Sequence, residues 1–165
     1  MKLRKLKLKD APYMLEWMHD DSVVHDLNKN FSVMTIDDCN AFINNSVNEN
    51  HIHMAIVDDE DQYMGTVSLK KINYEKKTAE FGITIRSVAM RKGYSIFAMR
   101  GMLGYAYQHG IQKVFWCVSP RNERALKFYD KNSFQKVSFK KIGSDVGYPE
   151  DKIKEFVWYQ DGVSI

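Results

Sequence analysis

The sequence predicts an α+β domain built on one mixed, mostly antiparallel sheet with helices on its faces. Three strand-like runs follow one another at 51–57, 63–71 and 78–85, and only short polar turns separate them. Strands joined by short turns pair antiparallel. Beyond residue 94, helix-like and strand-like runs alternate, which is typical of helices packed against the same sheet. A chain of 165 residues fits one domain, spanning 1–165.

The first third of the chain predicts one strand followed by two helices. Leucines recur between the basic residues of 2–9, which favours a solvated strand face over a nucleic-acid or membrane patch. Asp10 caps the first helix, whose apolar stripe is formed by Met14, Leu15, Trp17 and Met18. Thr35 and Asp38 resemble a capping box at the start of the second helix.

The last part of the chain predicts two more helices and three more strands. The helices are expected at 94–109 and 121–132, with a strand at 113–118 between them. Two further strands are expected at 134–140 and 153–159. Together with the earlier runs, they predict a seven-stranded sheet flanked by about four helices.

The composition excludes several classes of protein. A hydrophobic content of 44% and a net charge of +3 suit a globular protein and do not call for a nucleic-acid partner. Two cysteines cannot form a disulfide framework, and no apolar stretch reaches the roughly 18 residues of a membrane span. We therefore expect a cytoplasmic protein that binds neither nucleic acid nor membrane.

A glycine turn at Ala89–Ser95 is the strongest local signal. It lies between the strand-like run 78–85 and a helix-like run that continues to His109. The first N–H groups of a helix have no partner inside the helix, and the helix dipole adds partial positive charge there, so such a turn can hold a phosphate. The same pattern also describes an ordinary strand-to-helix connection without a ligand.

Four spaced motifs give the turn its context. They are Ala79-Glu80-Phe81-Gly82-Ile83, Lys92-Gly93-Tyr94-Ser95, Asn122-Glu123-Arg124-Ala125 and Phe128-Tyr129. In this order they resemble the Gcn5-related N-acetyltransferases (GNAT), closest to the RimJ/RimL-type branch. The resemblance implies a sheet whose fourth and fifth strands splay apart. It also implies direct transfer of the acetyl group of acetyl-CoA to a primary amine, either a protein N-terminal α-amine or a small-molecule amine.

The resemblance also implies which residues hold acetyl-CoA. The backbone of the fourth strand pairs with the pantetheine arm through Ile83, Thr84 and Ile85. The pyrophosphate loop consists of Arg91, Lys92, Gly93, Tyr94, Ser95 and Ile96. Met90 and Ser95 depart from the family pattern, so we expect an altered CoA affinity rather than its loss. Asn122 helps to hold the cofactor, although it also suits a plain helix N-cap.

Tyr129 takes the family's general-acid position and would protonate the CoA thiolate. It follows Asn122 by seven residues, or two helical turns, so both side chains face the same cleft. A phenol with a pKa of about 10 stays protonated at neutral pH, where a thiol of about 8.5 begins to ionise. The alternative is an ordinary buried aromatic beside Phe128.

The general base is less well defined by the sequence. Cys117 stands where ribosomal-protein acetyltransferases have a glutamate, and it fits a small buried residue better than a nucleophile. Glu80 is the better candidate, since an apolar cleft would raise its pKa toward neutrality. The alternative for Glu80 is an exposed strand residue paired with Lys76 or Lys77. A weak base suits α-amines and amino sugars better than lysine side chains.

The acceptor amine is left open. Its specificity is expected to come from 20–34, 73–77 and 142–151, with Trp17, His25, Asp26, Phe31 and Tyr148 as the groups of interest. Three alternatives to the main hypothesis remain: an amino-sugar N-acetyltransferase of nucleotide-sugar biosynthesis, a non-catalytic acetyl-CoA-binding module, and an interaction protein that kept only the fold. His51 and His53 lack a third ligand, so no metal site is expected. The protein is expected to be a monomer or homodimer.

Overall fold

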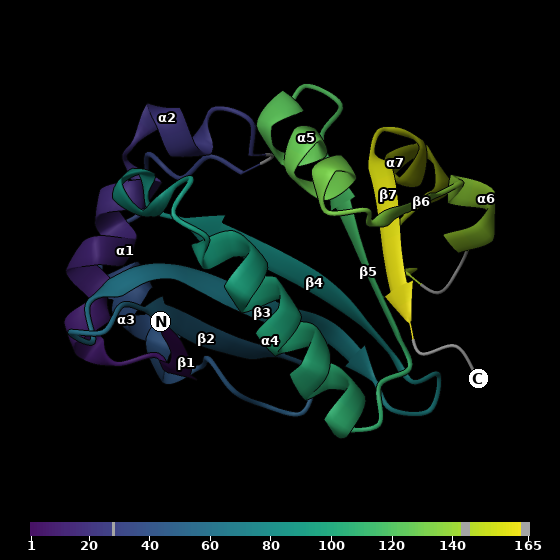
Figure 1. Ribbon diagram of the computed structural model, residues 1–165. Coiled ribbons are helices and arrows are strands. Elements are labelled where there is room, and N and C mark those ends of the chain that lie inside the picture. Colours follow the sequence, from purple (N-terminus) through teal and green to yellow (C-terminus); the bar gives the residue numbers. More distant parts are fainter. Residues whose placement is uncertain (28, 143–145, 163–165) are drawn as a thin grey trace.

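One seven-stranded sheet runs through the protein (Figure 1). The computed structural model describes residues 1–27, 29–142 and 146–162. In chain order the strands are β1 (Lys2–Lys5), β2 (Ile52–Val57), β3 (Tyr63–Asn73), β4 (Thr78–Ile85), β5 (Lys113–Val118), β6 (Gln135–Val137) and β7 (Val157–Gly162). Their order in the sheet is β1-β2-β3-β4-β5-β7-β6, with β4 and β5 parallel and the other neighbours antiparallel. The predicted α+β class and strand number are confirmed.

The four predicted helices are all present, and short ones accompany them. The helices are α1 (Ala11–Met18), α2 (Asp21–Val24), α3 (Ile36–Asn44), α4 (Tyr94–Gln108), α5 (Glu123–Lys131), α6 (Phe139–Ile142) and α7 (Glu150–Lys154). Two 3₁₀ turns are η1 (Leu8–Asp10) and η2 (Ser87–Ala89). The expected number of about four was therefore too low for the described residues, because α2, α6 and α7 span only one turn or slightly more.

Three strand boundaries were predicted wrongly. The first strand ends at Lys5 instead of residue 9, because η1 begins at Leu8. The strand expected at 134–140 is only β6, and α6 follows it. The strand expected at 153–159 is shifted to β7, because α7 occupies 150–154 and buries Ile153. Short apolar runs are compatible with either a strand or a helix turn, so local pattern alone could not place them.

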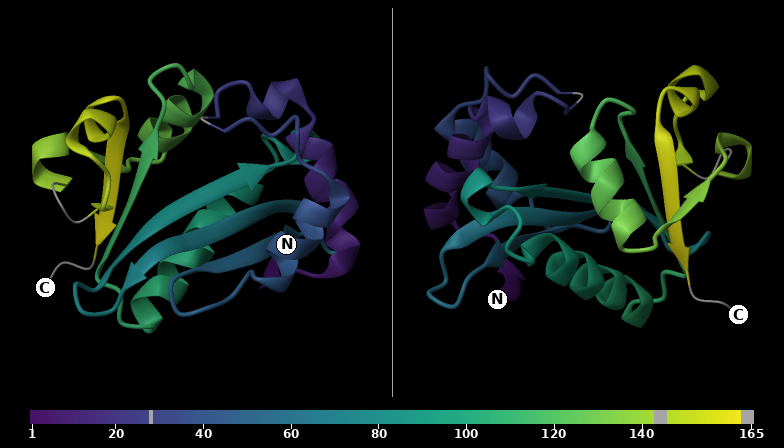
Figure 2. Two further views of the ribbon diagram at one scale, coloured as in Figure 1. Left: turned by 180° about the vertical axis from the view of Figure 1, so that it is seen from behind. Right: turned by 45° about the horizontal axis from the view of Figure 1, so that its top comes forward.

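Helices cover both faces of the sheet, as the two views in Figure 2 show. α4 and α5 cover one face, with a buried cluster that includes Val67, Phe81, Met99, Met102, Trp116 and Tyr129. α1 and α3 cover the other face at β2 and β3, with Met14, Trp17, Cys39, Ile43 and Tyr63. A third cluster lies at the C-terminal strands and contains Phe115, Ile142, Val146, Ile153 and Trp158.

The sheet splays between β4 and β5. The two strands pair only through Thr78–Glu80 and Lys113–Phe115. Beyond these residues β4 continues to Ile85 with β3 as its partner, and β5 continues to Val118 with β7 as its partner. Figure 1 shows the two strands diverging like the arms of a V. The predicted splay of the fourth and fifth strands is confirmed.

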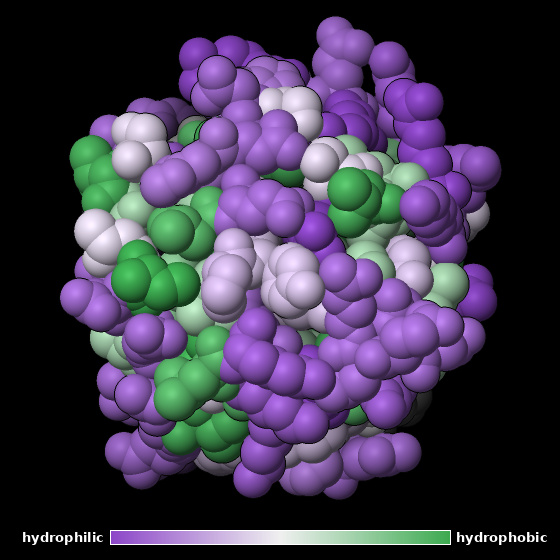
Figure 3. Space-filling view, turned by 90° about the vertical axis from the view of Figure 1, so that its left-hand side faces the viewer, coloured by the Kyte–Doolittle hydropathy of each residue, from purple (hydrophilic) through white to green (hydrophobic). Residues whose placement is uncertain are grey.

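The outer surface is mixed in character. Figure 3 shows the side that carries α1, where hydrophobic residues form separate groups between hydrophilic ones. The large exposed hydrophobic residues include Leu8, Val33, Ile36 and Val88. Among the described residues, no helix combines the length and the apolar character needed to cross a bilayer.

Candidate active site

The inner edge of β4 is open along the residues predicted to bind the pantetheine arm. Ile83, Thr84 and Ile85 pair with β3 on one side only. Their other edge faces the opening of the V, beyond the last residue that pairs with β5. A strand edge of this kind has N–H and C=O groups available for an extended ligand. The geometry therefore fits the group that the sequence predicts there.

The turn before α4 has the backbone expected of an anion site. Gly93 is the N-cap, with a φ of 87° and no side-chain cap. The first backbone bond into the helix runs from the Phe97 N–H to the Gly93 carbonyl. Within the described ranges, the N–H groups of Tyr94, Ser95 and Ile96 have no hydrogen-bond acceptor. The helix end therefore offers three free donors to a phosphate.

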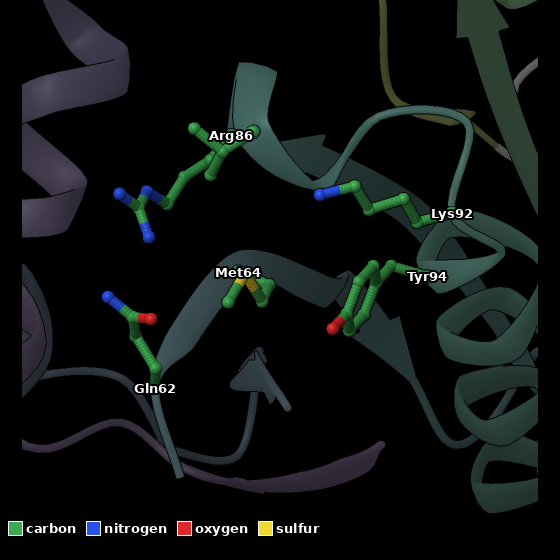
Figure 4. Close-up of a pocket in the computed structure, with 6 residues that line it drawn as sticks. Gln62, Met64, Arg86, Lys92 and Tyr94 are labelled. Atoms are coloured by element: carbon green, nitrogen blue, oxygen red, sulfur yellow. The ribbon is translucent and has the colours of Figure 1, made fainter. Parts of the chain in front are cut away.

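A cavity of about 310 Å³ adjoins this turn. Figure 4 shows Lys92 and Tyr94 entering it from the turn, with Met64 of β3 and Gln62 on the other side. The fifth labelled residue, Arg86, directs its guanidinium group toward α1, where Nε and Nη2 donate to the two carboxylate oxygens of Glu16 at 3.0 and 2.8 Å. Lys92 thus adds positive charge beside the predicted pyrophosphate loop.

Asn122 and Tyr129 lie at the two ends of the buried side of α5. Asn122 is the N-cap, and its Oδ1 accepts a hydrogen bond from the Ala125 N–H at 3.0 Å. The capping alternative is therefore confirmed for Asn122, and its amide NH₂ group remains for a ligand. Tyr129 is 6% exposed, with ring-centroid distances of 5.4 Å to Trp116 and 5.0 Å to Tyr159.

Two polar atoms of this aromatic cluster lack partners. Trp116 is 2% exposed, and its Nε1 is the one fully buried side-chain N or O atom without a hydrogen bond in the described part of the chain. The Tyr129 hydroxyl also has no hydrogen-bond partner among the described residues, and it is not sealed from the surface. Burial raises the pKa of Tyr129 above that of a free phenol, so the hydroxyl keeps its proton at neutral pH. The cluster thus offers donors to a ligand in the V.

Glu80 differs from both sequence interpretations. It is 3% exposed, and its carboxylate lies among polar groups instead of in an apolar cleft. Lys70 Nζ is 3.0 Å from Oε1, Lys71 Nζ is 3.4 Å from Oε2, and the Tyr148 hydroxyl donates to both oxygens at 3.1 and 3.0 Å. The expected partners, Lys76 and Lys77, are not those that the structure places there. The carboxylate is therefore held by two ammonium groups and one phenol hydroxyl.

A β-bulge brings both lysines to Glu80. Adjacent residues of a regular strand point to opposite faces, so Lys70 and Lys71 should diverge. The β3–β4 register shifts between Lys70 and Asn73, and Lys71 has a φ of 48°. This left-handed conformation costs about 1 kcal/mol or more for a residue with a side chain, and bulges that re-aim side chains are frequent at functional sites.

Cys117 lies between the groups of the candidate site. Burial and the negative charge of Glu80 raise the pKa of its thiol to about 11. The same thiol contributes to the raised pKa values of Tyr129 and Tyr148, which places it near both hydroxyls. At neutral pH fewer than about one thiol in a thousand is ionised at this pKa. The raised pKa therefore argues against Cys117 as a nucleophile, and the residue is only partly buried.

His53 and Ser68 extend the polar row along the same face of the sheet. His53 is 8% exposed, and its Nδ1 lies 2.6 Å from the Ser68 hydroxyl oxygen. Burial and the nearby His51 and Lys70 lower the pKa of His53 to about 4. The imidazole is therefore neutral at physiological pH. No group of three or more His, Cys, Asp or Glu residues that could hold a metal occurs in the described ranges.

The low pKa of His53 predicts loss of stability in acid. Its pKa rises from about 4 in the folded protein to about 6.5 on unfolding, so protonation favours the unfolded chain. The stability that neutral His53 contributes is present above pH 6.5 and is lost as the pH falls toward 4. The free energy of unfolding should therefore be lower by about 2 kcal/mol at pH 5. Urea unfolding at pH 7.5 and 5 should show this difference for the wild type. His53→Gln should remove it, whereas the same substitution at exposed His109 should not.

Of the side chains predicted to select the acceptor amine, only some lie at the candidate site. Tyr148 contacts Glu80, as described above. Trp17 is instead a core residue of α1 that donates from Nε1 to the Tyr63 hydroxyl at 3.1 Å, and Phe31 packs on its ring. His25 is exposed and pairs with Asp26 at 2.9 Å. Parts of the expected specificity segments, residues 28 and 143–145, lie outside the described residues.

The open end of the V is bridged by one arginine. Arg124 of α5 donates from Nη1 to the Ser22 carbonyl of α2 at 2.9 Å and lies 3.3 Å from the Met90 sulfur. This contact joins the segment before the pyrophosphate loop to α5. No individual role was predicted from the sequence for Arg124, Lys70, Lys71 or Trp116. The bulge has no signal in the local sequence, because it depends on the pairing of β3 with β4.

Comparison with known proteins identifies the family. Residues 1–135 match the model of the acetyltransferase (GNAT) domain. The chain belongs to the GNAT acetyltransferase family. GNAT enzymes of this kind use acetyl-CoA as cosubstrate, so the protein is an acetyl-CoA-dependent N-acetyltransferase. Spermidine N(1)-acetyltransferase of Vibrio cholerae is 25% identical to it over 122 residues, which cover 67% of this chain and 70% of the relative.

Solved structures share the GNAT fold. The crystal structure of Vibrio cholerae spermidine N-acetyltransferase in complex with CoA and spermine has a TM-score of 0.73 at 20% identity, covering 83% of this chain and 82% of that chain. A domain from Methanocaldococcus jannaschii has the same TM-score of 0.73 at 13% identity, with 98% and 97% covered. A dodecameric form of the Vibrio cholerae protein has a TM-score of 0.64. The RimJ/RimL branch and the monomer or homodimer stay predictions, as do the roles of the individual site residues.

Proposed function

We propose that this GNAT enzyme transfers the acetyl group directly to a primary amine in a ternary complex, with Tyr129 as general acid. The observation that carries the proposal is the Tyr129 hydroxyl. It is protonated and has no hydrogen-bond partner among the described residues, although its ring is held in an aromatic cluster. A buried tyrosine normally satisfies its hydroxyl. An open hydroxyl beside the splayed strands therefore supports a role toward a ligand.

The chain offers separate groups for binding and for proton transfer. Acetyl-CoA, when bound, supplies an activated thioester. The edge of β4 at Ile83–Ile85 would hold the pantetheine arm, and the turn at Arg91–Ile96 would hold the pyrophosphate. The Asn122 amide would orient the arm at the start of α5. Tyr129 would then deliver the proton on its hydroxyl oxygen to the departing thiolate.

Glu80 is the proposed base for the acceptor amine. It is the carboxylate close enough to Cys117 to raise the pKa of that thiol, which places it near the V. Two lysines and the Tyr148 hydroxyl already contact its oxygens, so it has few free sites for the proton of a strongly basic amine. Lysine side chains need about 3 pKa units of deprotonation at neutral pH, whereas α-amines and amino sugars need far less. The proposed acceptors are therefore α-amines or small amines of low pKa.

Thiol release from acetyl-CoA tests this function. The panel would contain a peptide with a free N-terminus, glucosamine and spermidine, the acceptor named for the relatives. Thiol release that depends on an amine, with the acetylated amine as product, is the expected result. Cys117→Ala should retain the rate within about threefold, because direct transfer needs no acyl-enzyme.

Three outcomes would contradict the proposal. An acetyl group found on Cys117 by mass spectrometry would contradict direct transfer. Acetyl-CoA binding without turnover of any amine would support a non-catalytic binding module. A protein that ignores acetyl-CoA altogether would have kept only the fold.

A further inference from the structure

The two lysines beside Glu80 differ in how many contacts their ammonium groups make. Lys71 Nζ contacts Glu80 Oε2 at 3.4 Å, donates to the Val146 carbonyl at 3.1 Å, and lies 3.1 Å from the centre of the Tyr148 ring. These contacts use its donors and fix the segment that carries Tyr148. Lys70 Nζ has Glu80 Oε1 as its one hydrogen-bond acceptor among the described residues. Lys70 therefore keeps donors for a ligand.

Lys70 also lies at the opening of the sheet. A Cβ added to Gly82 would be 3.3 Å from Lys70 Cε and 3.5 Å from Nζ, so the lysine side chain crosses directly over this glycine. Gly82 follows Glu80, the last residue of β4 that pairs with β5, by two positions and lies on the face away from α4. The Lys70 side chain is 41% exposed, so its ammonium group is accessible.

The described charged groups around Lys70 have a net positive charge. Its neighbours on β3, β4 and the segment after α6 are Lys71, Glu80 and Tyr148, and the neutral His53–Ser68 pair lies farther along the same face. Two ammonium groups thus meet one carboxylate in the described part of this face. Such an excess of positive charge attracts an anionic ligand and disfavours a polycation.

We propose that Lys70 binds a negatively charged group of the acceptor, so that the acceptor is an amine carrying a phosphate or a carboxylate. This inference rests on the proposed function, because it assigns the substrate class of the same site. The α4 face of the V carries the predicted cofactor turn and Asn122, so the acceptor reaches the V from the face of Lys70. Charge-assisted hydrogen bonds from an ammonium group to either anion are strong enough to set specificity.

Matched pairs of acceptors test the inference. Glucosamine and glucosamine 6-phosphate differ by a phosphate, and diglycinamide and diglycine differ by a carboxylate. Isothermal titration of the full-length protein in the presence of CoA should give at least about tenfold tighter binding of the charged member of one pair. The pair that shows the difference identifies the anion. KM values for acetylation should follow the same order, and added salt should weaken the preference.

Two variants assign the preference to Lys70. Lys70→Gln should remove most of it, by raising the Kd of the charged acceptor about tenfold while leaving the neutral acceptor and acetyl-CoA within about twofold. Lys5→Gln removes the same charge on β1, at the far edge of the sheet, and should leave the preference intact. The circular dichroism spectrum and melting temperature of each variant would confirm that it is folded.

The results separate the inference from the function on which it rests. Equal binding of charged and neutral acceptors, tighter binding of spermidine, or an undiminished preference in Lys70→Gln would overturn the role of Lys70. Acetylation of neutral amines alone would do so while leaving the proposed function intact. Binding of the charged acceptor without any thiol release would contradict the proposed function and support the anion site.

Discussion

Replacing Tyr129 by phenylalanine is expected to lower kcat by about a hundredfold or more and to leave acetyl-CoA binding within about twofold. The substitution removes one oxygen that makes no hydrogen bond to a described residue, so the aromatic packing with Trp116 and Tyr159 is kept. What is lost is the proton for the departing thiolate. Steady-state kinetics and titration with CoA would measure the two effects separately.

Tyr159→Phe is the matched control. Tyr159 lies in the same aromatic cluster, but its hydroxyl donates to Asp130 Oδ1 at 2.9 Å and is therefore already used. Its loss should cost some stability and leave kcat within about threefold. If Tyr129→Phe retained the wild-type kcat, or if both variants lost the same activity, Tyr129 would not be the acid. A wild-type kcat that does not fall up to pH 9.5 would agree with the raised pKa of Tyr129.

Gly65→Ala is expected to destabilise the protein by about 2 kcal/mol or more and to weaken acetyl-CoA binding. A Cβ at this position of β3 would lie 2.4 Å from the Thr84 carbonyl oxygen and 3.2 Å from Ile85 Cα. Both contacts are to backbone, so β4 has to move instead of a flexible side chain. The movement falls on the stretch that is predicted to pair with the pantetheine arm.

A second glycine provides the comparison for this effect. Gly104 lies inside α4, and an added Cβ would have no atom within 4 Å. Gly104→Ala should therefore stabilise the protein by up to about 1 kcal/mol and leave CoA affinity unchanged. Urea unfolding and CoA titration of both variants test the pair. Equal CoA affinity in Gly65→Ala and the wild type would show that the position of Thr84 is unimportant for the cofactor.

Sequence patterns predicted the structure correctly where neighbouring residues alone determine it. The runs that became β2, β3 and β4 alternate or are continuously apolar between polar turns, and the seven-residue spacing of Asn122 and Tyr129 placed both on the buried side of α5. Gly93 indicated the turn, because it takes a left-handed φ there. In each of these places a few neighbouring residues determine the outcome.

The errors arose where distant contacts decide the structure. Nothing local to Lys71 shows that it bends out of β3 to reach Glu80, since the bulge depends on pairing with β4. Trp17 fits the apolar stripe of its helix or the acceptor site equally well from the sequence, and only its contact with the distant Tyr63 shows that it belongs to the core. The segment 150–154 forms a helix because Ile153 packs under Trp158, which follows it in the chain.

The short seam between β4 and β5 has a consequence for how the protein unfolds. Backbone pairing joins the N-terminal half of the sheet to the C-terminal half through only three residues of each strand, and each half has a buried cluster of its own besides the one that spans both. Native-state hydrogen exchange should therefore resolve two cooperative units that open with different free energies. A ligand that bridges the arms of the V would couple them, so CoA binding should merge the two openings into one.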